Sequence, residues 1–312
     1  MSPQKALNEI ARQSDLDPHA MNDPETARLI INENKVLAEN TVPGLEVEVK
    51  ELRDGVDVKM ILAPDTVIKK PVHLCFGVIP KTGIQRINMD VRIGARSRIR
   101  LNAHCTFPYA EDVQHLMDAR IILDEGSDYS YFERHVHSES GGITVVPKAE
   151  VHVGENARFK TEFELIRGRV GKMDIRYTTH GASGSLVDMT ARVNGKGDDH
   201  LRLAEISFLE GADSRSVLTS KVAVRDNAVA EVFNQVTATG DRARGHVDCK
   251  EVVLDNGRAK ATPIVDVRNP SAHVTHEAAV GSVDKKQLET LMARGLDEDE
   301  ASELIIQGLL SE

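Results

Sequence analysis

Apolar and polar residues alternate along most of this chain, at the period of two that is typical of β-strands. The pattern begins near Thr41 with VPGLEVEVKELRDGVDVKMILAP and continues to about Thr275. Gly, Asn, Asp or Glu form small turns between the alternating runs, as in MDVRIGARSRIRL, ARIILDEGSDYSYF and AEVHVGENARFKTEF. The sequence therefore predicts a mainly β protein with a loose internal repeat.

Two architectures fit such a repeat: a β-helix, in which each coil buries its face against its neighbours, and a large antiparallel sandwich. Many short strands follow one another with no helix between them, which suits stacked coils better. The pattern favours the β-helix.

Helical patterns occur at both ends of the chain. Pro3 to Ser14 is a short polar candidate, and Asp23-Pro24 predicts the start of a second helix. Its apolar stripe would comprise Leu29, Ile30, Val36 and Leu37. We therefore expect an N-terminal helical segment over residues 1–40, a β-helix core over 41–275 and a C-terminal helical segment over 276–312.

The C-terminal segment predicts two short helices with clear boundaries. Asp284 and Asp297 are N-cap residues, Gln287 and Glu300 stand three positions later, and Gly295 ends the first helix. The expected apolar faces are Leu288, Leu291 and Met292, then Ala301, Leu304, Ile305 and Leu309. Helices this short need a surface to pack on, either within the chain or on a partner.

Composition narrows the function. Against 39 basic residues the chain has 49 acidic ones, a net charge of −10 that argues against nucleic acid as a partner. No apolar run is long enough to span a membrane, and the N-terminus is unlike a signal peptide. Cys75, Cys105 and Cys249 are too few and too far apart for a disulfide framework. We expect a soluble, cytoplasmic protein.

Two histidines near the middle of the chain are a first candidate site. His135, His137 and Glu139 in ERHVHSES are similar to the His-x-His and Glu ligands of cupins, but the glutamate follows too closely. We expect a solvated strand end here.

The segment from Gly245 to Gly281 holds more ligand types: Cys249, His246, His273, His276 and Glu277. On strands, His246 and Cys249 point to opposite faces, and so do His276 and Glu277. A metal site would thus need residues from two strands or two subunits. Spacing alone favours a buried, inert cysteine and two exposed histidines at a strand end over a metal site.

Three motifs in this region resemble the C-terminal signature of the SufB/SufD family: HVDCKEVVL, ATPIVDVRNPSAHVTHEA and ARGLDEDEASELIIQG. The likeness is dense from Gly245 to Leu310 and weaker upstream. It implies a right-handed parallel β-helix core that dimerises and binds an ABC-type ATPase, SufC, through its C-terminal helices. The chain itself has no complete Walker motif, since Thr190 precedes NGKGDD where a glycine is needed.

The resemblance carries over residue by residue. Cys249 matches the family's cluster-assembly cysteine, and His276 and Glu277 match its His-Glu pair. The cysteine favours the SufB branch, and the short N-terminal region suggests a homodimer rather than a SufB/SufD-type heterodimer. Lys221 matches a position near the family's internal tunnel.

The sequence thus predicts a scaffold without catalytic residues that assembles and transfers iron–sulfur clusters. It would receive sulfur from a donor and pass clusters to apo-protein acceptors. The resemblance leaves the cluster type and the involvement of a flavin open. The alternative is a β-helix enzyme, either carbohydrate-active or metal-dependent, but 4% aromatic residues and no Trp disfavour a sugar-binding groove.

Overall fold

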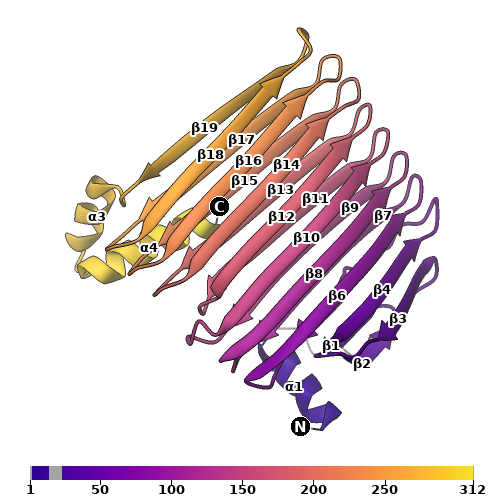
Figure 1. The fold of residues 1–312 in the computed structure, drawn as a ribbon, viewed down its shortest axis with the longest axis horizontal. Helices are drawn as coiled ribbons and strands as arrows, with labels where there is room; N and C mark the ends of the chain where they lie inside the picture. Colours follow the sequence, from indigo (N-terminus) through magenta and orange to yellow (C-terminus); the bar gives the residue numbers. More distant parts are fainter. Residues whose placement is uncertain (1, 14–22, 312) are drawn as a thin grey trace.

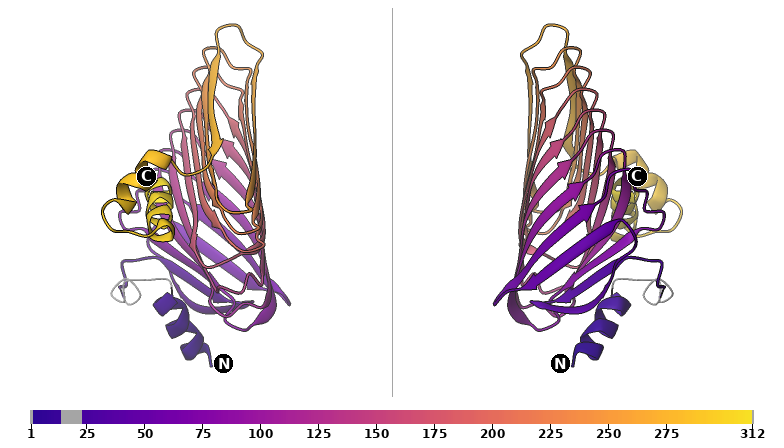
Figure 2. Two further views of the ribbon diagram at one scale, coloured as in Figure 1. Left: turned by 90° about the vertical axis from the view of Figure 1, so that its left-hand side faces the viewer. Right: turned by 90° about the vertical axis from the view of Figure 1, so that its right-hand side faces the viewer.

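The computed structural model describes residues 2–13 and 23–311, and Ser14 of the first expected helix lies outside them. The described chain is a β-solenoid of two facing sheets, with helices at its sides (Figures 1 and 2). The helices are α1 (Pro3–Gln13), α3 (Lys285–Met292) and α4 (Glu298–Ser311). This confirms the β-helix over the sandwich; the handedness stays a prediction.

The first sheet contains ten strands. From the C-terminal end of the solenoid they are β19 (His273–Gly281), β17 (Arg244–Val253), β15 (Arg215–Val224), β13 (Leu186–Gly195), β11 (Arg158–Arg167), β9 (Asp128–His137), β7 (Arg98–Phe107), β5 (Val72–Gly77), β1 (Arg28–Asn32) and β2 (Lys35–Asn40).

The second sheet contains nine strands. In the same direction they are β18 (Arg258–Val267), β16 (Val229–Ala238), β14 (His200–Leu209), β12 (Gly171–Gly181), β10 (Ile143–Val153), β8 (Asp112–Leu123), β6 (Thr82–Ile93), β4 (Gly55–Leu62) and β3 (Leu45–Glu51). From β4 onward each coil contributes one strand to each sheet, so strands that follow one another in sequence lie in opposite sheets.

Neighbouring strands of the solenoid are parallel and in register, with a coil length close to 29 residues. Arg158 pairs with Leu186, Leu186 with Arg215, and Arg215 with Arg244, which gives steps of 28, 29 and 29 residues. Alternate residues of every strand point inward, where they stack on those of the coils before and after. The continuous apolar core lies between the two sheets.

The turns at one edge explain the Gly, Asn and Asp residues of the repeat. One residue per coil has a positive φ, and its N–H donates a hydrogen bond to the next coil, to a carbonyl as Gly126 does to Glu155, or to the Ser271 hydroxyl in the case of Arg242. The positions are Arg96, Gly126, Asn156, Gly184, Asp213 and Arg242. Gly and Asn adopt this left-handed conformation at the lowest cost.

The expected helix after Asp23 is wrong. The Asp23 carboxylate caps a single turn, accepting hydrogen bonds from Glu25 N and Thr26 Oγ1. The apolar stripe belongs instead to β1 and β2, a hairpin joined by two residues, of which Glu33 has a φ of 55°. β1 also pairs in parallel with β5. The long-range pairing overrides a pattern that fits either structure locally.

Both C-terminal N-caps are confirmed. Asp284 accepts a hydrogen bond from Gln287 N at 2.7 Å, and Asp297 and Glu300 form a reciprocal capping box. The boundary at residue 276 is wrong, however, because β19 continues to Gly281 and the first C-terminal helix begins at Lys285. None of the helices in the described ranges is long and apolar enough to cross a membrane.

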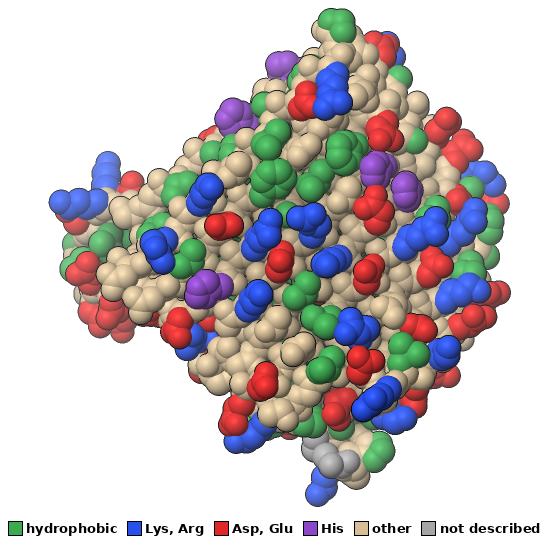
Figure 3. Space-filling model, in the orientation of Figure 1, with side chains coloured by type: hydrophobic (Ala, Val, Ile, Leu, Met, Phe, Trp, Pro, Cys, Tyr) green, Lys and Arg blue, Asp and Glu red, His purple; other side chains and the backbone are tan. Residues whose placement is uncertain are grey.

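The outer face is polar. Figure 3 shows basic and acidic side chains interspersed over the sheet, with hydrophobic side chains gathered toward the C-terminal coils. Many of the charged groups pair between adjacent coils, as Arg96 does with Asp65 and Arg98 with Asp128. Such exposed pairs each contribute little stability, so the interior stacking dominates.

Candidate functional site

Cys249 lies inside the solenoid, on β17 in the next-to-last coil of the first sheet. Its side chain is buried, and Asn234 Nδ2 donates a hydrogen bond to its Sγ at 3.6 Å. Burial raises the pKa of the Cys249 thiol to about 12, with nearby Glu251 adding to the effect. In this state Cys249 is a shielded thiol rather than a reactive thiolate.

Strand β19 places His276 and Glu277 on opposite faces, as the alternation predicts. His276 is in register with Val247 and Glu277 with Asp248. Because Val247 and Cys249 both face the interior, His276 shares their face. Its Cα lies diagonally from that of Cys249, at roughly 8 Å from strand spacing and rise. The structure therefore brings Cys249 and His276 to one face but leaves Glu277 on the other.

Sequence reasoning missed Glu251. It lies two residues after Cys249 on the same strand, so both side chains face the interior. The Glu251 side chain is buried, and neither carboxylate oxygen accepts a hydrogen bond from another described residue. Burial raises its pKa to about 7. The two-residue spacing from Cys249 is the signal that could have identified Glu251 as a carboxylate beside the thiol.

A chain of buried polar side chains leads to Cys249 from the preceding coils. Ser220 Oγ donates to Glu205 Oε2 at 3.3 Å, and Asn234 Nδ2 donates to Ser220 Oγ at 2.8 Å as well as to Cys249. Burial raises the pKa of Glu205 to about 8. This row, rather than Lys221, lines the interior.

Lys221 faces outward. The Ser220 and Val222 side chains on either side of it are interior, and Ala223, on the same face as Lys221, contacts Ile306 of α4. The strand alternation thus rules out the expected place of Lys221 beside an internal tunnel.

The last coil is uncovered. Val265 and Val267 of β18 are in register with buried Val236 and Ala238, and Val280 of β19 is in register with buried Glu251. These three interior-facing side chains are nevertheless 38%, 45% and 50% exposed, because no further coil stacks on them. The Cys249 site therefore lies one coil beneath an open, apolar end.

The histidines at 135 and 137 are not at a solvated strand end. Both point inward from β9 and are buried, whereas Glu139 lies beyond the strand. Alternation marks two faces of a strand, but only closure of the coil decides which of them is interior.

Comparison with known proteins identifies a family for this chain. Residues 83–309 match the family model described as "SUF system FeS cluster assembly, SufBD core domain". An iron-sulfur cluster assembly SufBD family protein of Pyrococcus horikoshii is 35% identical over 99% of this chain and 94% of its own length. A protein of the same description from Methanocaldococcus jannaschii is 34% identical over 91% of this chain and 90% of its own length.

The chain belongs to the SufB/SufD family. Membership of this family connects it with iron–sulfur cluster assembly through the SUF system.

Glu205 should make stability depend on pH. Its pKa is raised to about 8 in the folded protein, so the folded state holds the proton more tightly than the unfolded state does. Its stabilising contribution is complete below about pH 4.5 and is lost as pH rises toward 8. Glu205→Gln should abolish a loss of stability on the order of 4 kcal/mol over this range.

The measurement is urea unfolding at a series of pH values. Glu231→Gln, at an exposed position of β16, is the matched control and should leave the pH profile unchanged. A wild-type profile that Glu205→Gln does not flatten would show that this carboxyl is ionised throughout.

Proposed function

We propose that this chain is a non-catalytic scaffold of a cytoplasmic SUF system, on which nascent iron–sulfur clusters are assembled and from which they are transferred. The observation that carries the proposal is the position of Cys249: a buried thiol, on the same face as His276, one coil beneath an uncovered end. A sulfur donor would deliver sulfur to the Cys249 thiol, and apo-proteins would receive the finished cluster.

The ligand types near Cys249 suit transient binding. Thiolate, imidazole and carboxylate together hold iron less tightly than four thiolates, and a donor must release its cluster. Within one protomer the interior carboxylate is Glu251, whereas Glu277 faces outward and is suited to a ligand role across an interface. Iron and sulfide are the cargo of this site rather than resident groups.

A second SufBD chain is the proposed cover of the open end. Exposed valines on β18 and β19 would be removed from water by a matching end, and the free edge of β19 would gain strand partners. A two-fold contact of this kind shields Cys249 in the resting state. Movement of the protomers would then admit sulfur and iron.

The C-terminal helices are the proposed dock for an ABC-type ATPase. Helix α4 packs on the solenoid through Ile306 and Leu310, and Glu303 forms an ion pair with Arg225. The stripe expected from the sequence is only partly used, since Leu304 stays 48% exposed. Met292 of α3 is exposed as well, which leaves apolar side chains for a partner.

Replacement of the assembly cysteine is the direct test of the scaffold. Cys249→Ser should lower cluster iron and sulfide after anaerobic reconstitution by at least about tenfold, because the thiolate ligand is lost. Cys75→Ser, a buried cysteine near α1, is the control and should keep wild-type loading. Wild-type loading of Cys249→Ser would remove this site from the proposal, and absence of iron and sulfide from both would favour an enzyme.

The open end can be tested through self-association. Val265→Arg and Val280→Arg place a charge on the uncovered coil and should raise the dimer dissociation constant at least about 30-fold, or ~2 kcal/mol. Sedimentation velocity over a concentration series measures this. Val67→Arg, at an exposed valine near the other end, should leave association unchanged. Unaltered dimers of the two end variants would place the interface elsewhere.

Docking of the ATPase on α3 and α4 can be tested separately. Met292→Glu combined with Leu304→Glu should abolish co-purification with a SufC-like ATPase while leaving the fold intact, since both side chains are already exposed. Val67→Glu serves as the matched control. Retention of the ATPase by the double variant would show that it docks on another surface.

A further inference from the structure

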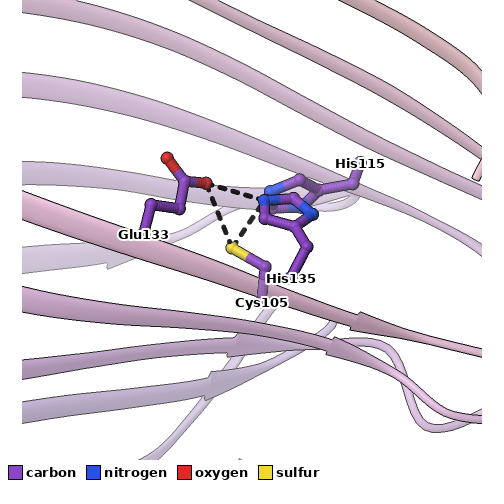
Figure 4. Close-up of side chains that lie close together, drawn as sticks. All are labelled: Cys105, His115, Glu133 and His135. Carbon is purple, nitrogen blue, oxygen red and sulfur yellow. Dashed lines mark hydrogen bonds and ion pairs between the residues drawn. The ribbon is translucent and has the colours of Figure 1, made fainter. Parts of the chain in front are cut away.

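Four side chains with metal-binding atoms meet inside the solenoid near its N-terminal end, far from Cys249. They are Cys105 of β7, His115 of β8, and Glu133 and His135 of β9 (Figure 4). All four are buried, and one ligand atom from each lies within 4.8 Å of the others. Cys105 is in register with His135, one coil apart, and His115 comes from the opposite sheet.

The distances suit a tetrahedral ion. Cys105 Sγ lies 3.7 Å from His115 Nε2 and 3.4 Å from Glu133 Oε1, and His135 Nε2 lies 2.8 Å from the same oxygen. Ligands of a tetrahedral zinc ion stand about 3.3 to 3.8 Å apart, given metal–ligand bonds of about 2.0 to 2.3 Å. Only small shifts of the side chains separate this cluster from a filled site.

The hydrogen bonds of His115 set its tautomer. The Gln85 amide donates from Nε2 to two backbone carbonyls, those of Glu33 and Gly77, so its Oε1 is the atom that faces His115 Nδ1 at 3.0 Å. His115 Nδ1 therefore carries the proton. Its Nε2 presents a lone pair to the cluster, and a support of this kind is what orients metal-binding histidines.

The same reasoning applies to His135. His137 Nδ1 faces the carbonyl of Arg169 and must donate to it, so His137 Nε2 is an acceptor. His135 Nδ1, 3.1 Å away, is then the donor to His137. In the neutral ring His135 Nε2 therefore carries a lone pair, as His115 Nε2 does, and this lone pair points at Glu133 Oε1. Either a proton on His135 Nε2 or a metal ion bound by both atoms makes this contact attractive.

Glu133 has further capacity to bind a cation. Its Oε2 is buried and accepts no hydrogen bond from the described residues. A thiolate and a carboxylate together neutralise a divalent ion, which makes the loaded site uncharged in an apolar interior. The interior walls are aromatic: the rings of Phe107 and Phe163 lie 5.0 Å from His115 and 4.9 Å from His135, respectively.

An access route lies beside the cluster. A pocket of about 670 Å³ at the strand ends is lined by His135 and His137, together with side chains from α1 and α4. His135 belongs to both the cluster and the lining of this pocket, so the pocket adjoins the cluster at this residue.

We propose that Cys105, His115, Glu133 and His135 bind one divalent transition-metal ion of the zinc or ferrous class in tetrahedral geometry. The ion would link the two sheets, and its binding releases the Cys105 thiol proton to solvent. The site is separate from the proposed assembly site and does not depend on it: β7 and β17 are five strand spacings apart, or roughly 24 Å.

The test uses the full chain with Cys249→Ser as background, so that the C-terminal thiol does not contribute. After chelation under reducing conditions, titration with Co²⁺ should give a single bound ion with a thiolate-to-cobalt charge-transfer band and the intense visible bands of tetrahedral cobalt. Zn²⁺ should displace it, whereas Fe²⁺, added anaerobically, should compete only in excess, and the two affinities measured by this competition identify the preferred ion.

Three variants make the test specific to this site. Cys105→Ser should remove the charge-transfer band, and Cys75→Ser should retain it. Gln85→Leu, which removes only the support of His115, should keep the band but weaken binding about 10- to 100-fold. Zn²⁺ should raise the melting temperature of the background protein and not that of Cys105→Ser, whose fold circular dichroism confirms.

Two outcomes would overturn the proposal. If Co²⁺ gives no thiolate band at stoichiometric concentration, the four side chains are held together by hydrogen bonds without a metal ion, with a charged His135 paired to Glu133. If the band persists in Cys105→Ser, another thiol binds the ion. Should Cys105→Ser fail to fold, unchanged affinity in Gln85→Leu would be equally decisive against the site.

Discussion

The stacking of each coil's inward side chains on those of the next is the interaction on which this structure depends. Parallel, in-register pairing satisfies the backbone between coils, and burial of alternate side chains supplies the hydrophobic stabilisation. No coil can bury its own face alone. Every interior residue is therefore constrained by the positions one coil before and one coil after it, about 29 residues away.

That constraint makes interior polar residues informative. A buried polar group costs free energy unless its neighbours in the adjacent coils satisfy it. Glu205, Ser220, Asn234 and Cys249 form a hydrogen-bonded series through successive coils, although Asn234 Oδ1 accepts no hydrogen bond from the described residues. The cluster around Cys105 is joined by contacts between adjacent coils and across the two sheets. In both places the chain retains polar groups where apolar residues would pack more simply, which is the pattern expected of functional positions.

The two ends of the solenoid are finished differently. At the N-terminal end the antiparallel hairpins β1–β2 and β3–β4 terminate the sheets, and Ile10 of α1 packs on the outside of β1. At the C-terminal end β18 and β19 have no such cover, while α4 packs beside β15 instead of over the last coil. The end nearest Cys249 is thus the one that the monomer leaves open. The proposed interface and the proposed assembly site therefore lie at the same end of the solenoid.

The sequence alone determined the local features: the strand alternation, the turn residues, the capped C-terminal helices and the opposite faces of His276 and Glu277. These depend on interactions within a few residues. It failed where closure of the coil decides, since period-two alternation does not say which face is interior. His135 therefore looked solvated although it is buried. Its contact with Cys105, 30 residues earlier, and the exposure of Val280 arise only when one coil stacks on another, or when the last has nothing to stack on.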